Sequence, residues 1–335
     1  MSSTLTIAVL PPTNPCATLF SPAAWRQLSG FGKILRNESA DANLDEEQAK
    51  VLLADADVCI TSWGSPRLSP AVVKAAPRLK LLCHAAGSVK PFVSEAVWER
   101  GIKVTSAAAA IAVGVAETTL GWIIVAAKQA LVANQAVHAG GWKREMRFPA
   151  GDLPGKRIGI VGASHVGRNV IRLLAQFDVE ILLYDPYVTA RAAAELGAKK
   201  VTLDDLMSTA DIISLHAPKT DETHHMINAK NLALVRDGVT LINTARGSLI
   251  DEAAFVEHLK TGRIWAILDV TDPEPPVADH PFRSLPNVVL TPHIAGTVDT
   301  GRTRIGECVT EEVRRFAAGE PQKHEVTREM LSHIG

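Results

Sequence analysis

Short runs of apolar residues alternate with longer alanine-rich stretches along most of the 335-residue chain. Early runs are TLTIAVL, DVCITS, LKLLCH and IKVTS, and later runs are RIGIVG, VEILLYD, DIISLH, VTLINT, IWAILDV and NVVLTPH. Runs this short, bounded by turn residues, predict strands. Their alternation with helical stretches predicts parallel βαβ units with helices on both faces of a sheet. The pattern therefore predicts two successive α/β sheets.

Two longer stretches predict helices on either side of the later strands. AETTLGWIIVAAKQALVANQAV is largely apolar and contains no proline, which predicts one long helix from Ala116. Gly140, Gly141 and the segment 149–154 follow it and are typical of a linker. The stretch 297–319 predicts a second helix, because apolar side chains recur at spacings of four, four and three, at Ile305, Val309, Val313 and Phe316.

This last helix has no third sheet to belong to. The simplest topology returns it to the first sheet, so that the first domain is built from both chain ends and the second is inserted. We therefore expect one domain of residues 1–117 with 298–335, and an inserted domain of residues 118–297. A chain of this length exceeds the usual limit of a single core, and 47% apolar residues can fill two.

Charge and cysteine usage narrow the class of function. Lys and Arg number 35 against 36 Asp and Glu, and neither sign forms a long block, which argues against nucleic-acid and membrane partners. The four cysteines form no CxxC pair, so we expect no metal site. The start, MSSTLTIAVLPP, lacks the basic region of a signal peptide, and the apolar run from Leu120 stops at Lys128. These features favour a cytoplasmic protein that acts on a small molecule.

The stretch RIGIVGASHVGR is similar to a dinucleotide-binding GxGxxG turn. In such a turn the first glycine permits the tight bend, the second lets the backbone approach the pyrophosphate, and the third lets helix and strand pack closely. Gly162 and Gly167 stand at the first and third positions. Ser164, at the second, either crowds the phosphates or donates a hydrogen bond to them, and His165 either covers them or is solvated. By itself the turn is equally consistent with a plain strand–turn–helix.

An acidic residue at the end of the next strand strengthens the case for a cofactor. Asp185 follows Gly162 by 23 residues, close to the spacing of about 20 at which an acid meets the adenosine ribose. Because a carboxylate there would repel a 2′-phosphate, we expect NAD rather than NADP. The alternative is a solvated aspartate before Pro186.

Every strand of the second sheet ends in a polar residue. Ligands of open parallel sheets bind outside the carboxyl ends of the strands. Each of these residues is ordinary alone, but the set predicts a binding site: His216, Asn243, Thr244, Arg246, Asp269 and His293.

Three polar side chains indicate proton transfer on a substrate that carries a carboxylate. Arg246 follows a buried strand, and its guanidinium can hold a carboxylate with two parallel bonds. His293 can donate or accept a proton near neutral pH. Glu274, between prolines in DPEPP, would fix the tautomer of His293 and stabilise its imidazolium if the two meet. The alternatives are a structural salt bridge, a structural histidine and a solvated loop glutamate.

Together, LINTARGSLIDE, ILDVTDPEPP and LTPHIAG resemble three stretches of the D-isomer-specific 2-hydroxyacid dehydrogenases. In that family they hold an Arg, a Glu and a His in this order, here 28 and 19 residues apart. The similarity runs from residue 57 to residue 321. It implies a flavodoxin-like substrate domain assembled from both chain ends, an inserted NAD-binding Rossmann domain, a site in the cleft between them, and a homodimer.

The resemblance also implies roles for single residues. Arg246, Glu274 and His293 match the catalytic groups, and the backbone amides of a loop at Ala86, Gly87 and Ser88 match the hold on the substrate carboxylate, together with Arg246. His216 and Pro218 match a loop beside the adenosine, Thr244 lies near the nicotinamide side, and Asp269 matches the acid that accepts from the carboxamide. The cofactor-binding set is Gly162, Ser164, His165, Val166, Gly167, Asp185, His216, Pro218, Thr223, Thr244, Ala245, Asp269 and Gly296.

Two departures from the family pattern bear on cofactor and substrate. Ser164 replaces the usual middle glycine and His165 the basic residue that commonly follows it. The loop at residues 85–90, AAGSVK, lacks the glycine-rich sequence followed by an acidic residue that is usual in the family.

The expected activity is reversible hydride transfer between NADH and a small 2-oxo acid, giving the D-2-hydroxy acid, with His293 as acid and base. The alternative is a dinucleotide-sensing binding protein, similar to the co-repressors that share the fold. Glu274 argues against formate oxidation, whose enzymes carry Gln there. The end of the sequence near the last helix argues against a phosphoglycerate dehydrogenase of the longer type.

Overall fold

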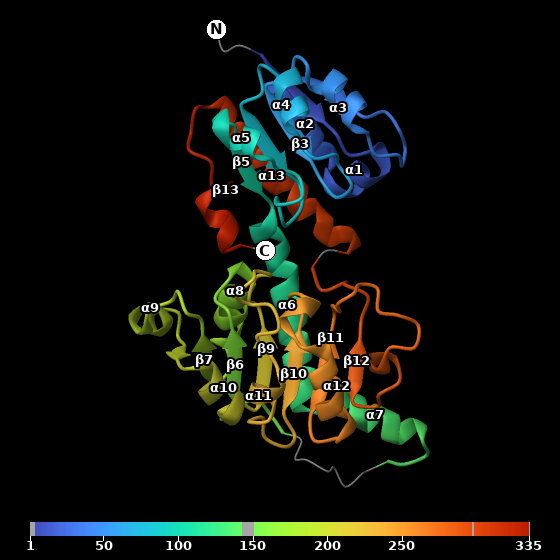
Figure 1. The fold of residues 1–335 in the computed structure, drawn as a ribbon, viewed down its shortest axis with the longest axis vertical. Helices are drawn as coiled ribbons and strands as arrows, with labels where there is room; N and C mark the ends of the chain where they lie inside the picture. Colours follow the sequence, from blue (N-terminus) through green and yellow to red (C-terminus); the bar gives the residue numbers. More distant parts are fainter. Residues whose placement is uncertain (1–3, 143–150, 297, 335) are drawn as a thin grey trace. The chain divides into compact units, whose positions relative to one another are not determined.

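The computed structural model describes residues 4–142, 151–296 and 298–334. The chain forms two compact α/β units: residues 1–111 with 297–335 make unit 1, and residues 112–296 make unit 2. Unit 1 takes its residues from both ends of the chain, coloured blue and red in Figure 1, and unit 2 from the middle. The predicted fold class is therefore confirmed. The domain limits drawn after residues 117 and 297 stay predictions.

Unit 1 is built on a six-stranded sheet with the order β13-β5-β4-β3-β1-β2. Five strands are parallel in the 2-1-3-4-5 order of flavodoxin-like folds, and β13 runs antiparallel to β5. The strands are β1 (Leu5–Val9), β2 (Gly32–Arg36), β3 (Val58–Thr61), β4 (Leu81–His84), β5 (Lys103–Ser106) and β13 (Glu325–Val326). The helices are α1 (Thr13–Leu19), α2 (Pro22–Phe31), α3 (Glu46–Leu53), α4 (Pro70–Ala75), α5 (Glu95–Glu99), α13 (Thr303–Ala317) and the short η3 (Asp299–Arg302) and η4 (Glu329–Ser332).

Helix α13 packs on the sheet of unit 1, as its lack of another sheet predicts. Its apolar stripe, Ile305, Val309 and Val313, is at most 2% exposed and shares one core cluster with Ile7 and Val9 of β1. The predicted helix at 297–319 is shorter, because the turn η3 precedes it, and residue 297 lies outside the described residues.

Unit 2 is built on a seven-stranded parallel sheet with the order β12-β11-β10-β9-β6-β7-β8, and these strands can be followed across Figure 1. The order reverses between β6 and β9, which is the topological switch point of a Rossmann fold, where ligands bind. The strands are β6 (Arg157–Val161), β7 (Glu180–Tyr184), β8 (Lys199–Lys200), β9 (Ile212–Leu215), β10 (Thr240–Asn243), β11 (Trp265–Leu268) and β12 (Val288–Leu290). Helix α6 (Ala108–Ala127) begins in unit 1 and continues into unit 2. The other helices of unit 2 are α7 (Ala130–His138), α8 (His165–Leu174), α9 (Ala190–Glu195), α10 (Leu203–Thr209), α11 (Ala229–Leu232), α12 (Glu252–Lys260) and the short η1 (Gly247–Leu249) and η2 (Pro281–Arg283).

The single helix predicted from Ala116 is wrong at its start and in its continuity. Helix α6 begins earlier, at Ala108, because the segment before Ala116 is rich in alanine, which favours helix. Gln129 then adopts a left-handed conformation with φ 48°, which separates α6 from α7. Part of the linker predicted at 149–154 lies outside the described residues.

At 20 residues, α6 is the one helix in the described part of the chain that is long and apolar enough to cross a membrane by length and composition. The apolar run counted only from Leu120 left out the part of α6 from Ala108 to Thr119, so it underestimated the length of the apolar helix. The same composition is found in core helices of soluble proteins, and α6 buries Ala116, Ile123 and Ala127 in the core of unit 2.

Candidate active site

The turn after β6 requires two positions without a side chain. Gly162 has φ +95°, and a Cβ there would lie 2.7 Å from the amide nitrogen of Ala217. A Cβ on Gly167 would overlap the carbonyl of Gly162. The two glycines therefore permit a tight turn and a close approach of α8 to β6, as predicted for the first and third positions.

Ser164 caps α8. Its Oγ accepts a hydrogen bond from the amide of Gly167 at 3.4 Å, and its φ of −64° is unstrained. The amides of His165 and Val166 have no acceptor within the part of the chain that the structure describes. The positive end of a ten-residue helix is thus available to an anion, and a dinucleotide pyrophosphate fits it. The pKa of His165 lies below its usual value, first because of burial and then because of the Arg168 charge, so this side chain is mainly neutral at neutral pH.

Asp185 follows β7, and the backbone holds both of its oxygens. Oδ2 accepts a hydrogen bond from the amide of Ala163 at 2.8 Å, and Oδ1 accepts one from the amide of Tyr187 at 2.9 Å. Since Ala163 belongs to the glycine turn, the carboxylate is fixed directly beside it. A fixed carboxylate in this place fits ribose hydroxyls.

His216 lies beneath the glycine turn, so the structure does not present it at an open strand end. It is 3% exposed, its Nε2 lies 2.9 Å from Ser214 Oγ, and its Nδ1 has no partner in the described chain. Burial lowers the pKa of His216 to about 3, so the ring is neutral. In the loop that follows, Thr223 Oγ1 donates to the carbonyl of Pro218 at 2.6 Å. His216 therefore supports the turn by packing.

A buried asparagine shapes the turn that carries Arg246. Asn243 Nδ2 donates to the carbonyl of Arg246 at 2.8 Å, and its Oδ1 accepts from the amide of Ala245 at 3.0 Å. Thr244 Oγ1 lies 3.0 Å from Thr119 Oγ1 on α6. The sequence carries no signal for this last contact, because the two threonines are 125 positions apart.

Asp269 holds the segment that carries His293. The carboxylate is 2% exposed and accepts hydrogen bonds from Thr291 Oγ1 at 2.5 Å and from the amides of Ile294 and Ala295, each at 2.9 Å. The amide of His293 donates to the backbone carbonyl of Asp269 at 2.9 Å. A carboxylate offers about four acceptor positions, so one stays available to a cofactor amide. The sequence did not indicate this role in orienting the histidine.

The same segment is held against α6. Thr118 Oγ1 donates to the carbonyl of Ala295 at 3.2 Å. A Cβ on Gly114 would overlap the carbonyl of Gly296, so the backbone at Gly296 lies directly on the helix.

His293 and Glu274 form the predicted pair. His293 Nδ1 and Glu274 Oε1 are 2.6 Å apart, and the side chains are 48% and 41% exposed. The tautomer assigned from this bond carries its proton on Nδ1, which leaves Nε2 to exchange a proton. His293 holds a left-handed φ of 53°, rare for a residue with a side chain. The surrounding segment thus holds the backbone of His293 in an unusual conformation, and this sets the direction of its imidazole.

Arg246 lies in the same electrostatic environment as this pair. Burial lowers the pKa of the guanidinium, and the charge of Glu274 raises it. An arginine stays charged through such shifts. Its Nη1 donates to the carbonyl of Ala245 at 2.6 Å, and its other N–H groups can bind a carboxylate. In unit 2, the carboxylate of Glu274 thus interacts with both the imidazole of His293 and the charge of the Arg246 guanidinium.

In unit 1, Ala86, Gly87 and Ser88 form a loop directly after β4. Ser106 Oγ donates to the carbonyl of Gly87 at 2.5 Å, and Ser62 Oγ donates to the carbonyl of Ala85 at 2.9 Å. Among described residues, no acceptor faces the amides of Gly87 and Ser88. A fixed loop with available amides is suited to binding a carboxylate.

The Rossmann strand order, the glycine turn and the fixed Asp185 define unit 2 as a dinucleotide-binding domain. Residues 120–295 match the profile described as the NAD binding domain of the D-isomer specific 2-hydroxyacid dehydrogenases. The chain belongs to this family, as the resemblance predicted, and its cofactor is NAD.

Relatives and solved structures of this family cover most of the chain. D-3-phosphoglycerate dehydrogenase of Methanocaldococcus jannaschii is 35% identical over 83% of this chain and 53% of the relative. Glyoxylate reductase of Korarchaeum cryptofilum is 33% identical over 90% of this chain and 93% of the relative. A phosphoglycerate oxidoreductase structure from Rhizobium etli has a TM-score of 0.82 at 26% identity and covers 97% of this chain and 99% of its own. The chain spans about half the length of the phosphoglycerate dehydrogenases that it matches.

Proposed function

We propose that this protein catalyses the reversible NAD(H)-dependent reduction of a small 2-oxo acid to the D-2-hydroxy acid. The observation that carries the proposal is the 2.6 Å hydrogen bond between His293 and Glu274 in a domain that matches the family's NAD-binding profile. NADH, when bound, supplies the hydride. The protein supplies the proton, the hold on the substrate and the orientation of both.

His293 is the proposed acid and base. In the direction of reduction its imidazolium donates the Nε2 proton to the oxygen that develops negative charge at the substrate carbonyl. Glu274 accepts the hydrogen bond of Nδ1 and stabilises the imidazolium. In the reverse direction the neutral ring takes the proton back. Asp269 supports both steps, because its carboxylate fixes the segment on which the imidazole stands.

Arg246 is the proposed anchor of the substrate carboxylate. Its charge in a partly buried place gives strong, directed hydrogen bonds to a planar anion. In unit 1, the amides of Gly87 and Ser88 are proposed as a second element that binds the substrate. The substrate class follows from these donors and from the names of relatives, which include a glyoxylate reductase and a hydroxypyruvate reductase.

We further propose that the protein is a cytoplasmic homodimer without nucleic-acid or membrane partners. Only 28% of the most apolar stretch of α6 is buried within this chain, and Ile124 and Val137 on α6 and α7 are 38% and 43% exposed. A second copy of the chain would cover such a surface. Sedimentation at increasing protein concentration measures the association.

The experiment that tests the function is NADH oxidation with glyoxylate, hydroxypyruvate and pyruvate, followed by a wider set of 2-oxo acids ranked by kcat/KM. Parallel runs with NADPH measure the contribution of Asp185, which is expected to disfavour a 2′-phosphate. Turnover with one of these acids, lost in His293→Ala, supports the enzyme. Tight NADH binding with no turnover of any 2-oxo acid would instead favour the dinucleotide-sensing protein, the alternative that the family relatives make less favourable.

A further inference from the structure

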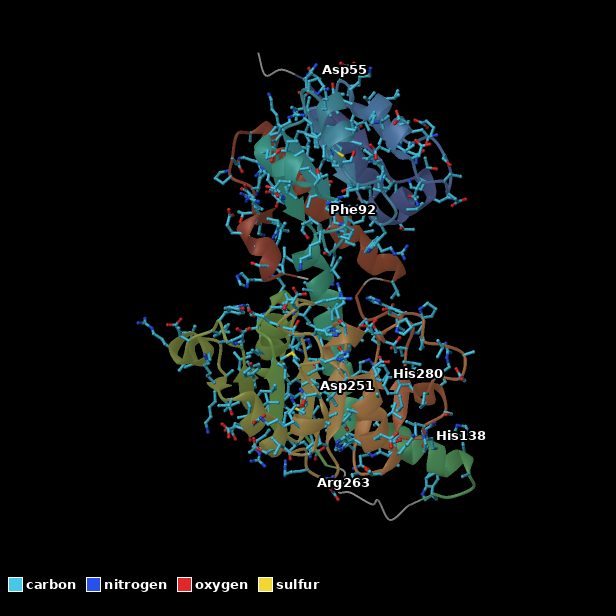
Figure 2. All side chains as sticks on the ribbon, in the orientation of Figure 1. Asp55, Phe92, His138, Asp251, Arg263 and His280 are labelled. Carbon is cyan, nitrogen blue, oxygen red and sulfur yellow. The ribbon has the colours of Figure 1, made fainter. Side chains whose placement is uncertain are left out.

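Both ends of the segment that carries Glu274 meet one carboxylate. This segment runs from Asp272 to His280, between β11 and η2. Glu252, the first residue of α12, accepts a hydrogen bond from the amide of Asp272 through Oε1 at 2.9 Å. Its Oε2 lies 3.2 Å from His280 Nε2. Figure 2 labels His280 on this segment and Asp251, the residue before Glu252, at the start of α12.

The hydrogen bonds define the protonation of this contact. His280 Nδ1 accepts from the amide of Phe282 at 3.2 Å, which assigns the ring proton to Nε2, facing Glu252. Oε1 of Glu252 accepts the hydrogen bond of the Asp272 amide, and Oε2 lies 3.2 Å from the ring nitrogen of His280 that carries the proton. The side chains of Glu252 and His280 are 13% and 14% exposed, so water has little access to these contacts.

Burial opposes the ionisation of Glu252. Burial raises the pKa of Glu252 to about 7, although the hydrogen bond from Asp272 opposes the shift. A substitution of Glu252 that removes one acceptor oxygen therefore disrupts one of its two contacts with the segment. A glutamine at this position has a single acceptor oxygen and can satisfy only one end of the segment.

Glu252 also connects this segment to the turn of Arg246. It stands six positions after Arg246, and the intervening turn lies so close to the segment that a Cβ on Gly247 would overlap the backbone of Thr271. The turn that carries Arg246 and the 272–280 segment that carries Glu274 are thus packed together. Glu252, which follows this turn, contacts both ends of the 272–280 segment.

We propose that Glu252 is a positioning residue that holds Glu274 in hydrogen-bond distance of His293 by binding both ends of the 272–280 segment. The inference rests on the proposed function. It assigns Glu252 no contact with the substrate or the cofactor, and its whole effect on turnover passes through Glu274.

A double-mutant cycle tests this route. The enzymes are the unaltered protein, Glu252→Gln, Glu274→Gln and the double variant, assayed with NADH and the best 2-oxo acid of the panel. Glu252→Gln is expected to lower kcat about tenfold with KM for NADH unchanged, a fraction of the 10²-fold that a 1 Å misplacement costs. In the Glu274→Gln background, the same change is expected to alter kcat less than about twofold, because the group it positions no longer carries the charge.

Two further variants serve as control and replacement. Glu257→Gln lies on the same helix, where Glu257 is 71% exposed and pairs with the surface Lys260 at 2.7 Å, and it is expected to keep the unaltered kcat. His280→Asn keeps an acceptor for the amide of Phe282 but cannot reach Glu252. If Glu252→Gln does not fold, His280→Asn takes its place in the cycle.

Non-additive losses of kcat support the inference. An equal loss in both backgrounds, or a Glu252→Gln enzyme that matches Glu257→Gln, overturns it. If the unaltered protein reduces none of the 2-oxo acids, the proposed function fails instead, and the inference falls with it.

Discussion

Replacing Glu274 with glutamine removes the charge beside His293 and keeps the shape of the side chain. A hydrogen bond between charged groups contributes about 1.5–3 kcal/mol. Both side chains are more than 40% exposed, so solvent screening places this pair at the low end, about 1.5 kcal/mol. Because about 1.4 kcal/mol corresponds to a factor of ten in rate, Glu274→Gln is expected to lower kcat about tenfold.

The assay is steady-state NADH oxidation with a 2-oxo acid, repeated with NADH deuterated at the transferred position. In the unaltered enzyme the imidazolium is the active form for reduction. Loss of the neighbouring carboxylate should therefore slow the chemical step and increase the isotope effect. His293→Ala, as the reference, removes proton transfer itself and should cost about 10²- to 10⁴-fold. A Glu274→Gln enzyme with unchanged kcat and an unchanged isotope effect would refute the assignment of the pair.

Three other predictions follow from single contacts. Gly247→Ala should destabilise unit 2 by about 1–3 kcal/mol, because the added Cβ would overlap the backbone of Thr271. Gly121→Ala, in open space on α6, should stabilise the unit slightly, and urea unfolding measures the free energy of unfolding of both variants. Asp269→Asn should lower kcat and cost about 1–3 kcal/mol of stability, since an amide cannot accept all the donors that the carboxylate binds. The pKa of His216 is lowered to about 3 by burial, so the unfolded chain binds the extra proton and stability should fall as pH drops from 6.5 toward 3; unfolding at several pH values, with His216→Gln as comparison, checks the slope of up to about 1.4 kcal/mol per pH unit.

The strands at the centre of each sheet could be predicted from the sequence, and so could the edge strand β12, whereas the edge strands β2, β8 and β13 could not. All ten apolar runs form strands, because burial on both faces demands continuous apolar sequence. Strand β2, with the sequence GKILR, is half exposed at an edge, and β8 and β13 are two residues long. Such strands depend on pairing with a neighbour rather than on their own composition, so periodicity does not detect them.

The contact between His293 and Glu274 could be predicted because two prolines and a strand end limit where each side chain points. The supporting contacts could not. The family resemblance assigned Asp269 to the cofactor, but its carboxylate also accepts three hydrogen bonds from the segment around His293. His216 shares that kind of place and is buried. Strand ends locate a site, while the direction of each side chain depends on packing partners far away in the sequence. The catalytic roles themselves stay predictions.

The origin of unit 1 from both ends of the chain has a consequence during translation. The β1 and α2 side chains that pack with α13, among them Ile7 and Leu28, leave the ribosome before their partners Ile305 and Val309, and all 185 residues of unit 2 are synthesised between residue 111 and residue 297. At about 5–20 residues per second, the half-made core waits about 10–40 s with an apolar face uncovered. Unit 2 has all its own strands before then, so the middle of the chain completes its fold first, and the segment synthesised before it is the part that a chaperone would need to shield.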